Sequence, residues 1–500
     1  MTAAHGAAGA DKAKSLWREI VGEPHFSDDP AALAALAPNA SAFAPRELLA
    51  LLRPADAGQV ARIVRVACEH GVPLYPTSTG RNWGLGSRQP VQGGCALLDL
   101  SRLDRIREVD ERGRYAVVEP GVTQAALAAH LAAHAPAVAA NVTGSSPRSS
   151  VLGNLLERGT GFRRHRVDEV RGLEVVLGTG ELVRTGLWAG EGGRQLHHYR
   201  TGFGPGLDTL FTQSNLGVVT AAVVDLVPRQ EDFRLLMFSF PDGALSGVVD
   251  RVRELFLQGT LRSIVHVFND KRILTLSRSD DVATWTGVTA VDGTRAQVAL
   301  AVQEARAALE GPAGARLTAV DRAAAAAPDA DPMVAGLYAV HSGEPSTMFL
   351  EGMYQSVPGI EVPADVDDLD GSGLGYLACM PVVAVDGPTV VELVDRIEGT
   401  CAEFGLVPAI AVNPTGPDYL ETVVNLYFDR RAAGEAENAH ACNAELHRRL
   451  YEDGFRFYRA DIENLRRLTE RDTAPWGAIG LIKQALDPAG ILAPGRYCPS

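Results

Sequence analysis

The chain has 500 residues, of which 46% are hydrophobic and 22% charged, and its formal net charge is -14 at pH 7. This length allows two globular domains with substantial cores, and the negative charge argues against nucleic acid or an anionic membrane as a partner. No segment reaches the ~18 uninterrupted apolar residues of a spanning helix, and the first residues lack the pattern of a secretory signal. We therefore expect a cytoplasmic protein with no membrane partner.

Helices and strands alternate through the first part of the chain. Residues 54–70 carry apolar side chains at helical spacing and end before Gly71, which predicts a helix. A second helix is predicted at 123–134, with Thr123 as its N-cap. Strands are predicted at 73–75, 95–100 and 115–119, and a hairpin at 170–177 and 181–184. The mixture predicts an α+β fold.

The composition changes near residue 233. Longer helical stretches rich in Ala, Arg and Leu follow, such as 296–310, and we expect a second domain to begin there. The run of alanines at 323–327 could form a helix or a loop, and we interpret residues 323–332 as loop.

Cysteines and histidines give no metal or disulfide pattern. The six cysteines contain no C-x-x-C pair, which predicts reduced, mostly buried thiols. His130 and His134 have the spacing of zinc ligands, but no glutamate follows His130. His440, Cys442 and His447 have no second ligand cluster, so we interpret them as part of a solvated helix. We expect no metal.

A glycine-rich loop at 76–86 has the makeup of a phosphate cradle. It reads Pro-Thr-Ser-Thr-Gly-Arg-Asn-Trp-Gly-Leu-Gly and follows the apolar residues 72–75. Glycine lets consecutive backbone N–H groups turn toward one anion, and the hydroxyl and amide side chains add donors, so a diphosphate fits. The loop is neither a Walker A motif nor a complete Rossmann fingerprint. Taken alone, the same residues could also form an ordinary turn.

Six further segments accompany this loop, at residues 118–123, 149–154, 157–161, 201–208, 210–220 and 486–495. Their order and spacing resemble the vanillyl-alcohol oxidase / p-cresol methylhydroxylase family of flavoproteins. The resemblance runs from about residue 51 to the end, strong in the first half and patchy between roughly 235 and 410. It implies a two-domain α+β fold with FAD between the domains, and a homodimer.

The resemblance implies an FAD-binding domain in residues 1–232, completed by residues 460–500, and a substrate or cap domain in residues 233–459. The diphosphate would lie on residues 77–86 and the adenine half near residues 213–219. The implied cofactor-binding residues are Pro76, Thr77, Ser78, Thr79, Gly80, Arg81, Asn82, Gly84, Leu85, Ser150, Gly153, Asn154, Gly161, Gly217, Val218, Val219, Tyr376 and Arg459.

Family members attach FAD covalently to a residue of the second domain, a histidine in oxidases and a tyrosine in the p-cresol branch. Residues 373–381 line up with that segment, and Tyr376 falls at the attachment position. A phenolic oxygen is chemically able to form such a bond. The alternative is a tyrosine on a buried strand whose hydroxyl bonds a neighbour.

Residues 455–461 resemble the family's Tyr-Arg pair. Arg459 would stand as a fixed cation where negative charge collects on the reduced flavin. Tyr458 would hydrogen-bond a substrate oxygen and help its deprotonation. The alternative for both is an ordinary amphipathic strand edge.

Two positions depart from the family. Members that oxidise para-alkylphenols carry a tyrosine where this chain has Leu85, and the oxidases carry an aspartate at the position of Ser145. A serine hydroxyl cannot abstract a proton without a partner base. Glu421 and Asp418, which precede a strand predicted at 423–428, are possible substitutes, unless they are solvated loop carboxylates. The implied catalytic residues are Tyr458, Arg459 and Glu421, and the implied substrate contacts are Leu85, Ser145, Tyr458 and Glu421.

The sequence thus predicts an FAD-dependent oxidoreductase of secondary metabolism that takes a hydride from an alcohol or a phenol-like aromatic compound. Dioxygen or an electron-carrier protein would reoxidise it. Two alternatives stay open: a para-alkylphenol dehydrogenase that passes electrons to a cytochrome, and a flavin-binding cyclase or isomerase that works without net oxidation.

Overall fold

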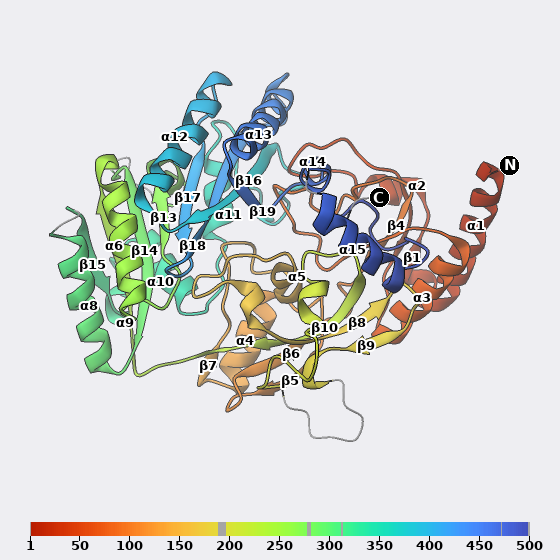
Figure 1. Cartoon of the computed structure of the whole chain (residues 1–500), viewed down its shortest axis with the longest axis horizontal. Coiled ribbons are helices and arrows are strands. Elements are labelled where there is room, and N and C mark those ends of the chain that lie inside the picture. The colour runs from red at the N-terminus through yellow and green to blue at the C-terminus, as the bar shows by residue number, and fades with distance from the viewer. Residues whose placement is uncertain (1, 189–196, 278–281, 312–313, 472, 499–500) are drawn as a thin grey trace.

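The computed structural model describes residues 2–188, 197–277, 282–311, 314–471 and 473–498. Within them, three sheets of four, five and eight strands organise the chain, with a small two-stranded pair of β7 (Val138–Ala139) and β11 (Val227–Pro228). The eight-stranded sheet and its helices form one side of the molecule, and the two smaller sheets form the other (Figure 1). The mixed α+β architecture predicted from the sequence is confirmed.

The four-stranded sheet carries the start of the glycine-rich loop. Its order is β1 (Phe26–Ser27), β2 (Leu48–Leu52), β4 (Cys95–Asp99) and β3 (Leu74–Thr77), and β2, β4 and β3 run parallel. The helices beside it are α1 (Thr2–Val21), α2 (Pro30–Ala34) and α3 (Ala57–His70). Asp56 caps α3 by accepting from the Gln59 N–H, and Gly71 ends it at φ 64°, as predicted.

The five-stranded sheet is antiparallel, in the order β5 (Ile106–Asp110), β6 (Tyr115–Val118), β10 (Gly217–Asp225), β8 (Val170–Leu177) and β9 (Leu182–Arg184). The predicted hairpin is its β8–β9 pair. Two helices, α4 (Gln124–His134) and α5 (Val151–Leu156), bury apolar side chains in the same core. Thr123 caps α4, as predicted, by accepting from the Ala126 N–H.

The eight-stranded sheet is built from residues 232–459. Its order is β15 (Arg316–Val320), β12 (Asp232–Phe240), β14 (Trp285–Gly293), β13 (His266–Asn269), β17 (Ala409–Pro414), β18 (Tyr419–Asp429), β16 (Leu374–Ala384) and β19 (Arg456–Arg459). Its outer face packs against α6 (Leu245–Leu257), α8 (Arg295–Leu309), α12 (Gly387–Glu403) and α13 (Glu435–Glu452) (Figure 1). The shorter helices are α7 (Asp270–Leu274), α9 (Arg322–Ala325), α10 (Pro332–His341) and α11 (Met348–Gln355).

The end of the chain returns to the four-stranded sheet. After α14 (Leu465–Thr469) and α15 (Thr473–Leu486), the Leu74 N–H donates to the Ile491 carbonyl at 2.8 Å, and the Ala493 N–H donates to the Leu74 carbonyl at 2.8 Å. Lys483 Nζ also donates to the Asn215 carbonyl at 2.6 Å. The last described residues therefore lie beside β3, where the glycine-rich loop begins.

Two sequence interpretations of the second half were wrong. Residues 322–325 form the short helix α9, because Asp321 caps it by accepting from the Ala324 N–H, whereas we expected a loop. The helix with His440, Cys442 and His447 is present as α13, but it is not solvated throughout: Cys442 and His447 are buried, because that face of α13 packs on the large sheet. Five of the six thiols are buried and all are free, as predicted.

No group of three or more His, Cys, Asp or Glu side chains in the described part of the chain is placed to hold a metal ion. None of the helices in the same residues is both long and apolar enough to cross a membrane.

The glycine-rich loop meets the large sheet at Gly84. Its carbonyl accepts from the Ala378 N–H of β16 at 3.2 Å, and its φ is 77°. A Cβ at this position would stand 2.6 Å from Cε1 of Tyr376. The loop can approach β16 this closely only because residue 84 has no side chain.

We expect Gly84→Ala to be more destabilising than Gly94→Ala. Both glycines have positive φ, 77° and 79°, but a Cβ at Gly94 meets nothing within 4 Å. Gly94→Ala should cost about 1–2 kcal/mol for the left-handed backbone, and Gly84→Ala a further 1–3 kcal/mol, roughly, for overpacking against Tyr376. Urea unfolding followed by tryptophan fluorescence measures both. Equal losses would show that the loop and β16 are not in tight contact.

Candidate active site

A cavity of about 360 Å³ lies where the three sheets meet. The implied site residues that line it are Pro76, Thr77, Ser78, Thr79, Gly80, Arg81, Asn82, Ser145, Ser150, Gly153, Asn154, Gly217, Val218, Val219, Tyr376, Tyr458 and Arg459. Gly84, Leu85, Gly161 and Glu421 are not part of this lining. The structure thus brings together segments that lie up to 380 residues apart in the sequence.

The glycine-rich loop is folded back on itself and fastened to the 149–154 segment. The Asn82 carbonyl accepts from the N–H groups of Leu85 at 3.2 Å and Ser87 at 2.9 Å. Thr79 Oγ1 accepts from the Ser150 N–H at 3.2 Å. A Cβ at Gly153 would lie 2.2 Å from Ser78 Oγ, so the two segments touch through a glycine. These contacts fix one wall of the cavity.

Ser150 reaches the cavity wall, but its hydroxyl serves the fold. It caps α5 by accepting from the Gly153 N–H at 2.8 Å and donates to the Pro120 carbonyl at 2.6 Å. Gly161 lies away from the lining and faces Asn141, whose Nδ2 would be 2.3 Å from a Cβ. Local packing therefore explains why residue 161 is glycine, and helix capping explains why residue 150 is serine.

Several buried polar atoms on the cavity wall lack a partner among the described residues: Ser149 Oγ, Asn154 Oδ1, Asn215 Oδ1 and Arg459 Nε. A buried polar group without a hydrogen bond costs about 1–3 kcal/mol, so such atoms indicate a ligand with polar groups along its length. FAD, with its diphosphate, ribose and ring oxygens, fits this donor and acceptor set.

Arg459 presents a positive charge on the cavity wall. It lies on β19, where it pairs with Met380 of β16, and its Nη2 donates to Asn82 Oδ1 at 2.8 Å. No ion pair to it occurs within the described residues. Arg459 therefore supplies a fixed cation beside the glycine-rich loop.

Tyr376 begins a hydrogen-bonded chain along the large sheet. Its hydroxyl donates to Asn425 Oδ1 at 3.0 Å, Asn425 Nδ2 donates to the Tyr427 hydroxyl at 3.0 Å, and Arg272 Nη1 donates to that hydroxyl at 2.5 Å. Burial raises the pKa of the Tyr376 phenol, while Arg272 and Arg459 act in the opposite direction. Tyr376 is therefore a neutral phenol held at a fixed angle, with two cations near it.

Tyr458 is connected to a buried carboxylate through one hydroxyl. Its phenol hydrogen-bonds the Thr160 side chain, and Thr160 Oγ1 donates to Glu421 Oε2 in a short contact. Glu421 Oε1 lies 2.9 Å from His165 Nε2. Burial raises the pKa of the Tyr458 phenol, and the Glu421 charge raises it further. These contacts connect the cavity to the interior of the protein through Tyr458, Thr160, Glu421 and His165, in that order.

The sequence placed Glu421 in a loop before a strand, and this was wrong. Strand β18 begins at Tyr419, and Glu421 pairs with Val382 of β16 and Asn413 of β17, so its side chain is only 1% exposed. Asp418 precedes the strand and is exposed, away from the cavity lining. Of the two candidate carboxylates, only Glu421 is buried behind the site.

His165 is 8% exposed and provides the positive partner of Glu421. Burial would lower the pKa of its imidazole, but the hydrogen bond and charge of Glu421 raise it above the ordinary value. Its Nε2 also lies 3.2 Å from the Arg158 carbonyl, a second acceptor, which places the proton on Nε2. The imidazole is therefore more basic than that of an ordinary histidine.

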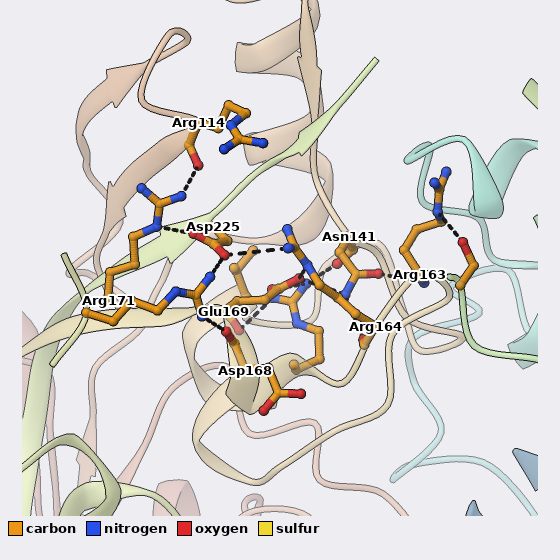
Figure 2. A network of polar contacts seen from close by, with 12 residues as sticks. Arg114, Asn141, Arg163, Arg164, Asp168, Glu169, Arg171 and Asp225 are labelled. Carbon is orange, nitrogen blue, oxygen red and sulfur yellow. Dashed lines mark hydrogen bonds and ion pairs between the residues drawn. The ribbon is translucent and has the colours of Figure 1, made fainter. Parts of the chain in front are cut away.

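A buried charge network holds the segment that carries Thr160 and His165 (Figure 2). Asp225, at the end of β10, pairs with Arg171 and lies 3.5 Å from Arg164 Nη1. Glu169 accepts from Arg164 Nε at 3.1 Å and from Asn141 Nδ2 at 2.7 Å. Because each charge has partners on other segments, residues 158–171 are tied to the five-stranded sheet.

The apolar part of the site surrounds Leu85. This side chain packs with Ala378 and Met380 of β16 and contacts Tyr376, Val423 and Tyr458. Ser145 Oγ lies 2.8 Å from Thr143 Oγ1 and accepts from Gln124 Nε2 at 3.2 Å, so it is a neutral hydrogen-bonding group. Of the two departures from the family, Leu85 thus lies behind the cavity wall as an apolar group, and Ser145 lies in the wall as an uncharged group.

Sequence reasoning missed Thr160, His165, Arg272 and the pair Glu157–Arg496, in which Arg496 Nη2 lies 2.6 Å from Glu157 Oε1. Thr160 belongs to the segment 157–161 that carried part of the resemblance, and that signal could have identified it. No local pattern marks His165 or Arg272, because their partners lie more than 150 residues away.

Comparisons with known proteins all point to one class of protein. Residues 48–186 match the model of an FAD binding domain. The chain is 32% identical to 1'-carboxy-chondrochloren decarboxylase of Chondromyces crocatus over 97% of both chains. It is 26% identical to the flavoprotein subunit of 4-cresol dehydrogenase [hydroxylating] of Pseudomonas putida, over 88% of this chain and 85% of that one.

Two solved structures share the fold over 98% of this chain and 97% of theirs: 4-ethylphenol oxidase from Gulosibacter chungangensis, with a TM-score of 0.89 and 23% identity, and p-cresol methylhydroxylase, with a TM-score of 0.89 and 24% identity. The protein is an FAD-dependent oxidoreductase. It belongs to the vanillyl-alcohol oxidase / p-cresol methylhydroxylase family.

We expect the contribution of His165 to stability to depend on pH. Because the folded-state pKa is raised, this contribution is fully present below the unfolded value of about 6.5 and is lost as pH rises through the folded value. The stability lost in His165→Asn should therefore shrink between pH 6 and pH 9.5, measured by thermal unfolding. His134→Asn, at an exposed histidine, is the control and should show no such trend. A constant difference for His165→Asn would exclude the ion pair.

Proposed function

We propose that this protein oxidises a phenol-like aromatic substrate, or the corresponding benzylic alcohol, by removing hydride from the carbon attached to the ring. The observation that supports it most is the connection from Tyr458, on the cavity wall, through Thr160 to the buried Glu421. A para-alkylphenol loses hydride from the carbon attached to the ring more readily once its hydroxyl is deprotonated, so a route for that proton is what the reaction needs.

FAD, when bound, supplies the two-electron acceptor that takes the hydride. We propose that the residues around 76–82, 153–154 and 217–219 hold it, since all line the cavity. Arg459 would stabilise the negative charge that reduction adds. We also propose that residues 1–232 and 460–500 form the FAD-binding domain and residues 233–459 the cap.

In the proposed reaction the substrate hydroxyl donates to Tyr458. Its proton moves to the Tyr458 oxygen while the Tyr458 proton moves to Thr160 and the Thr160 proton to Glu421. His165, protonated beside Glu421, keeps the carboxylate anionic until the proton arrives. Met380 and Val423, which line the cavity with Leu85 packed behind them, exclude water from the aromatic ring.

A second candidate is oxidative decarboxylation. Ser145, which lines the cavity, favours it because a serine hydroxyl cannot deprotonate the substrate or activate water without a partner base. If the substrate carries a carboxylate on the carbon next to the benzylic one, loss of hydride followed by loss of CO2 gives an alkene. The C–C bonding pair then forms the double bond, and no base is required. The relative in Chondromyces crocatus, 32% identical, is a decarboxylase by name.

We expect Tyr458→Phe and Thr160→Val to slow reduction of bound FAD by about 10²- to 10⁴-fold, the usual range for loss of acid–base assistance, with FAD content unchanged. Anaerobic stopped-flow absorbance with 4-alkylphenols, 4-hydroxybenzyl alcohol and 4-hydroxyphenylalkanoic acids measures the rate. Tyr338→Phe, at a tyrosine outside the cavity lining, is the matched control.

The same assay separates the alternatives. Release of one CO2 per FAD reduced by an acid identifies oxidative decarboxylation, and peroxide formation in air identifies dioxygen rather than a carrier protein as the acceptor. An unchanged rate in Thr160→Val would exclude the proton path. Tight binding of every phenol without FAD reduction would favour a redox-neutral role. The cytoplasmic location and the homodimer expected from the sequence stay predictions.

We further propose that Tyr376 bonds FAD covalently, since its phenol lines the cavity and two arginines counteract the effect of burial on its ionisation. Acid precipitation should then leave the yellow colour in the pellet of the wild type and release it in Tyr376→Phe. Tyr427→Phe, which alters the stacked neighbour 5.5 Å away, should keep the colour. Colour released by the wild type would exclude the bond.

A further inference from the structure

We propose that Arg272 binds a carboxylate of the substrate, so that the natural substrate is an aromatic acid. This inference rests on the proposed function, because it names the substrate class of the same cavity. Arg272 follows β13 in the large sheet, on α7, and lines the cavity with Tyr376 and Ser145.

The guanidinium of Arg272 is fixed at one edge and free at the other. Nη1 donates to the Tyr427 hydroxyl at 2.5 Å, and the Cζ atom stands 6.0 Å from the centre of the Phe349 ring. Nε is buried and has no hydrogen-bond partner among the described residues. Nε and Nη2 form the edge of the guanidinium that can donate to both oxygens of a carboxylate side by side.

The charges around the cavity leave Arg272 without a counterion. The acidic side chain in the lining is Glu157, and Arg496 pairs with it at 2.6 Å. Arg81, also in the lining, lies 3.7 Å from Asp367. In the part of the chain that the structure describes, no carboxylate lies within ion-pair distance of Arg272. A half-buried cation without a partner is costly, and an anionic substrate would neutralise it.

The surroundings of Arg272 favour the substrate over FAD as the source of this anion. Its two named contacts, Tyr427 and Phe349, belong to the large sheet and to α11. Phe349 lies against the other wall, where a Cβ at Gly144 would be 3.3 Å from its ring, next to Ser145. The loop proposed for the diphosphate begins at the end of β3, in another sheet. Arg272 thus faces the aromatic part of the cavity.

A carboxylate is favoured over a phenolate because Tyr458 already offers the phenol oxygen a partner with a proton path. A substrate with a phenol at one end and a carboxylate at the other would use both groups. Such a compound is also the kind that the decarboxylation candidate requires.

The test compares an acid with its amide in the holoenzyme. Isothermal titration calorimetry with 4-hydroxycinnamate and 4-hydroxycinnamamide reports binding without turnover, because neither compound has a saturated benzylic carbon to oxidise. The shorter pair 4-hydroxybenzoate and 4-hydroxybenzamide samples a second carboxylate position. We expect the wild type to bind one of the acids at least tenfold more tightly than its amide, which corresponds to about 1.4 kcal/mol.

Arg272→Gln should remove this preference, weakening the acid about 10- to 100-fold and the amide less than threefold. Arg272→Lys, which keeps the charge but not the two-pronged edge, should retain part of it. Arg262→Gln, at an exposed arginine shortly before β13, is the matched control. The FAD content should stay at the wild-type level in all variants.

Equal affinity of the wild type for both acids and their amides would overturn the proposal. Equal weakening of acid and amide in Arg272→Gln would also overturn it, since that would assign Arg272 to the phenol or to packing. Loss of FAD in this variant would overturn it too, since that would assign Arg272 to the cofactor. FAD reduction by neutral 4-alkylphenols tests the proposed function separately. If neither acid nor amide binds and no phenol reduces FAD, both the function and this inference fail.

Discussion

The close approach of the glycine-rich loop to strand β16 is the contact on which the site depends. The Ala378 N–H donates to the Gly84 carbonyl at 3.2 Å, and the edge of Tyr376 occupies the space that a side chain at residue 84 would need. This contact puts Leu85 against Met380 and Tyr458, and it brings Asn82 to Arg459. Without it, the loop and the large sheet would be two separate surfaces, and the cavity between them would not exist.

Buried polar contacts form a second connection between the large sheet and the five-stranded sheet, deeper in the molecule. Glu421, the end of the proposed proton path, comes from the large sheet. Thr160 and His165 come from the segment that Glu169 and Asp225 tie to the five-stranded sheet (Figure 2). Breaking a buried pair of charges costs about 3–5 kcal/mol, more than a surface pair contributes. The network therefore fixes where the proton path crosses between the sheets, and its burial keeps water out of that path.

The sequence predicted what is local and missed what depends on distant pairing. The loop at 76–86, the α4 cap at Thr123 and the β8–β9 hairpin follow from short patterns of glycine, hydroxyl and apolar residues, and all three are present. The burial of Glu421 was missed because its strand gains two partners, at 382 and 413, that no pattern near residue 421 reveals. Arg272 was missed for the same reason. Its charge indicates a ligand only because no carboxylate of the described residues lies within ion-pair distance, and the sequence around residue 272 does not reveal this.

The distribution of charge in the cavity also limits the chemistry. Arg459 has a role at the cofactor in the proposed reaction, and Arg81 and Arg496 have carboxylate partners, which leaves Arg272 as the cation whose counterion has to arrive from outside. Tyr458 and Arg272 would then bind the two ends of one molecule, a proton donor at the first and an anion at the second. A binding site with this polarity selects by charge as well as by shape, because a neutral phenol would leave the guanidinium edge desolvated and unpaired.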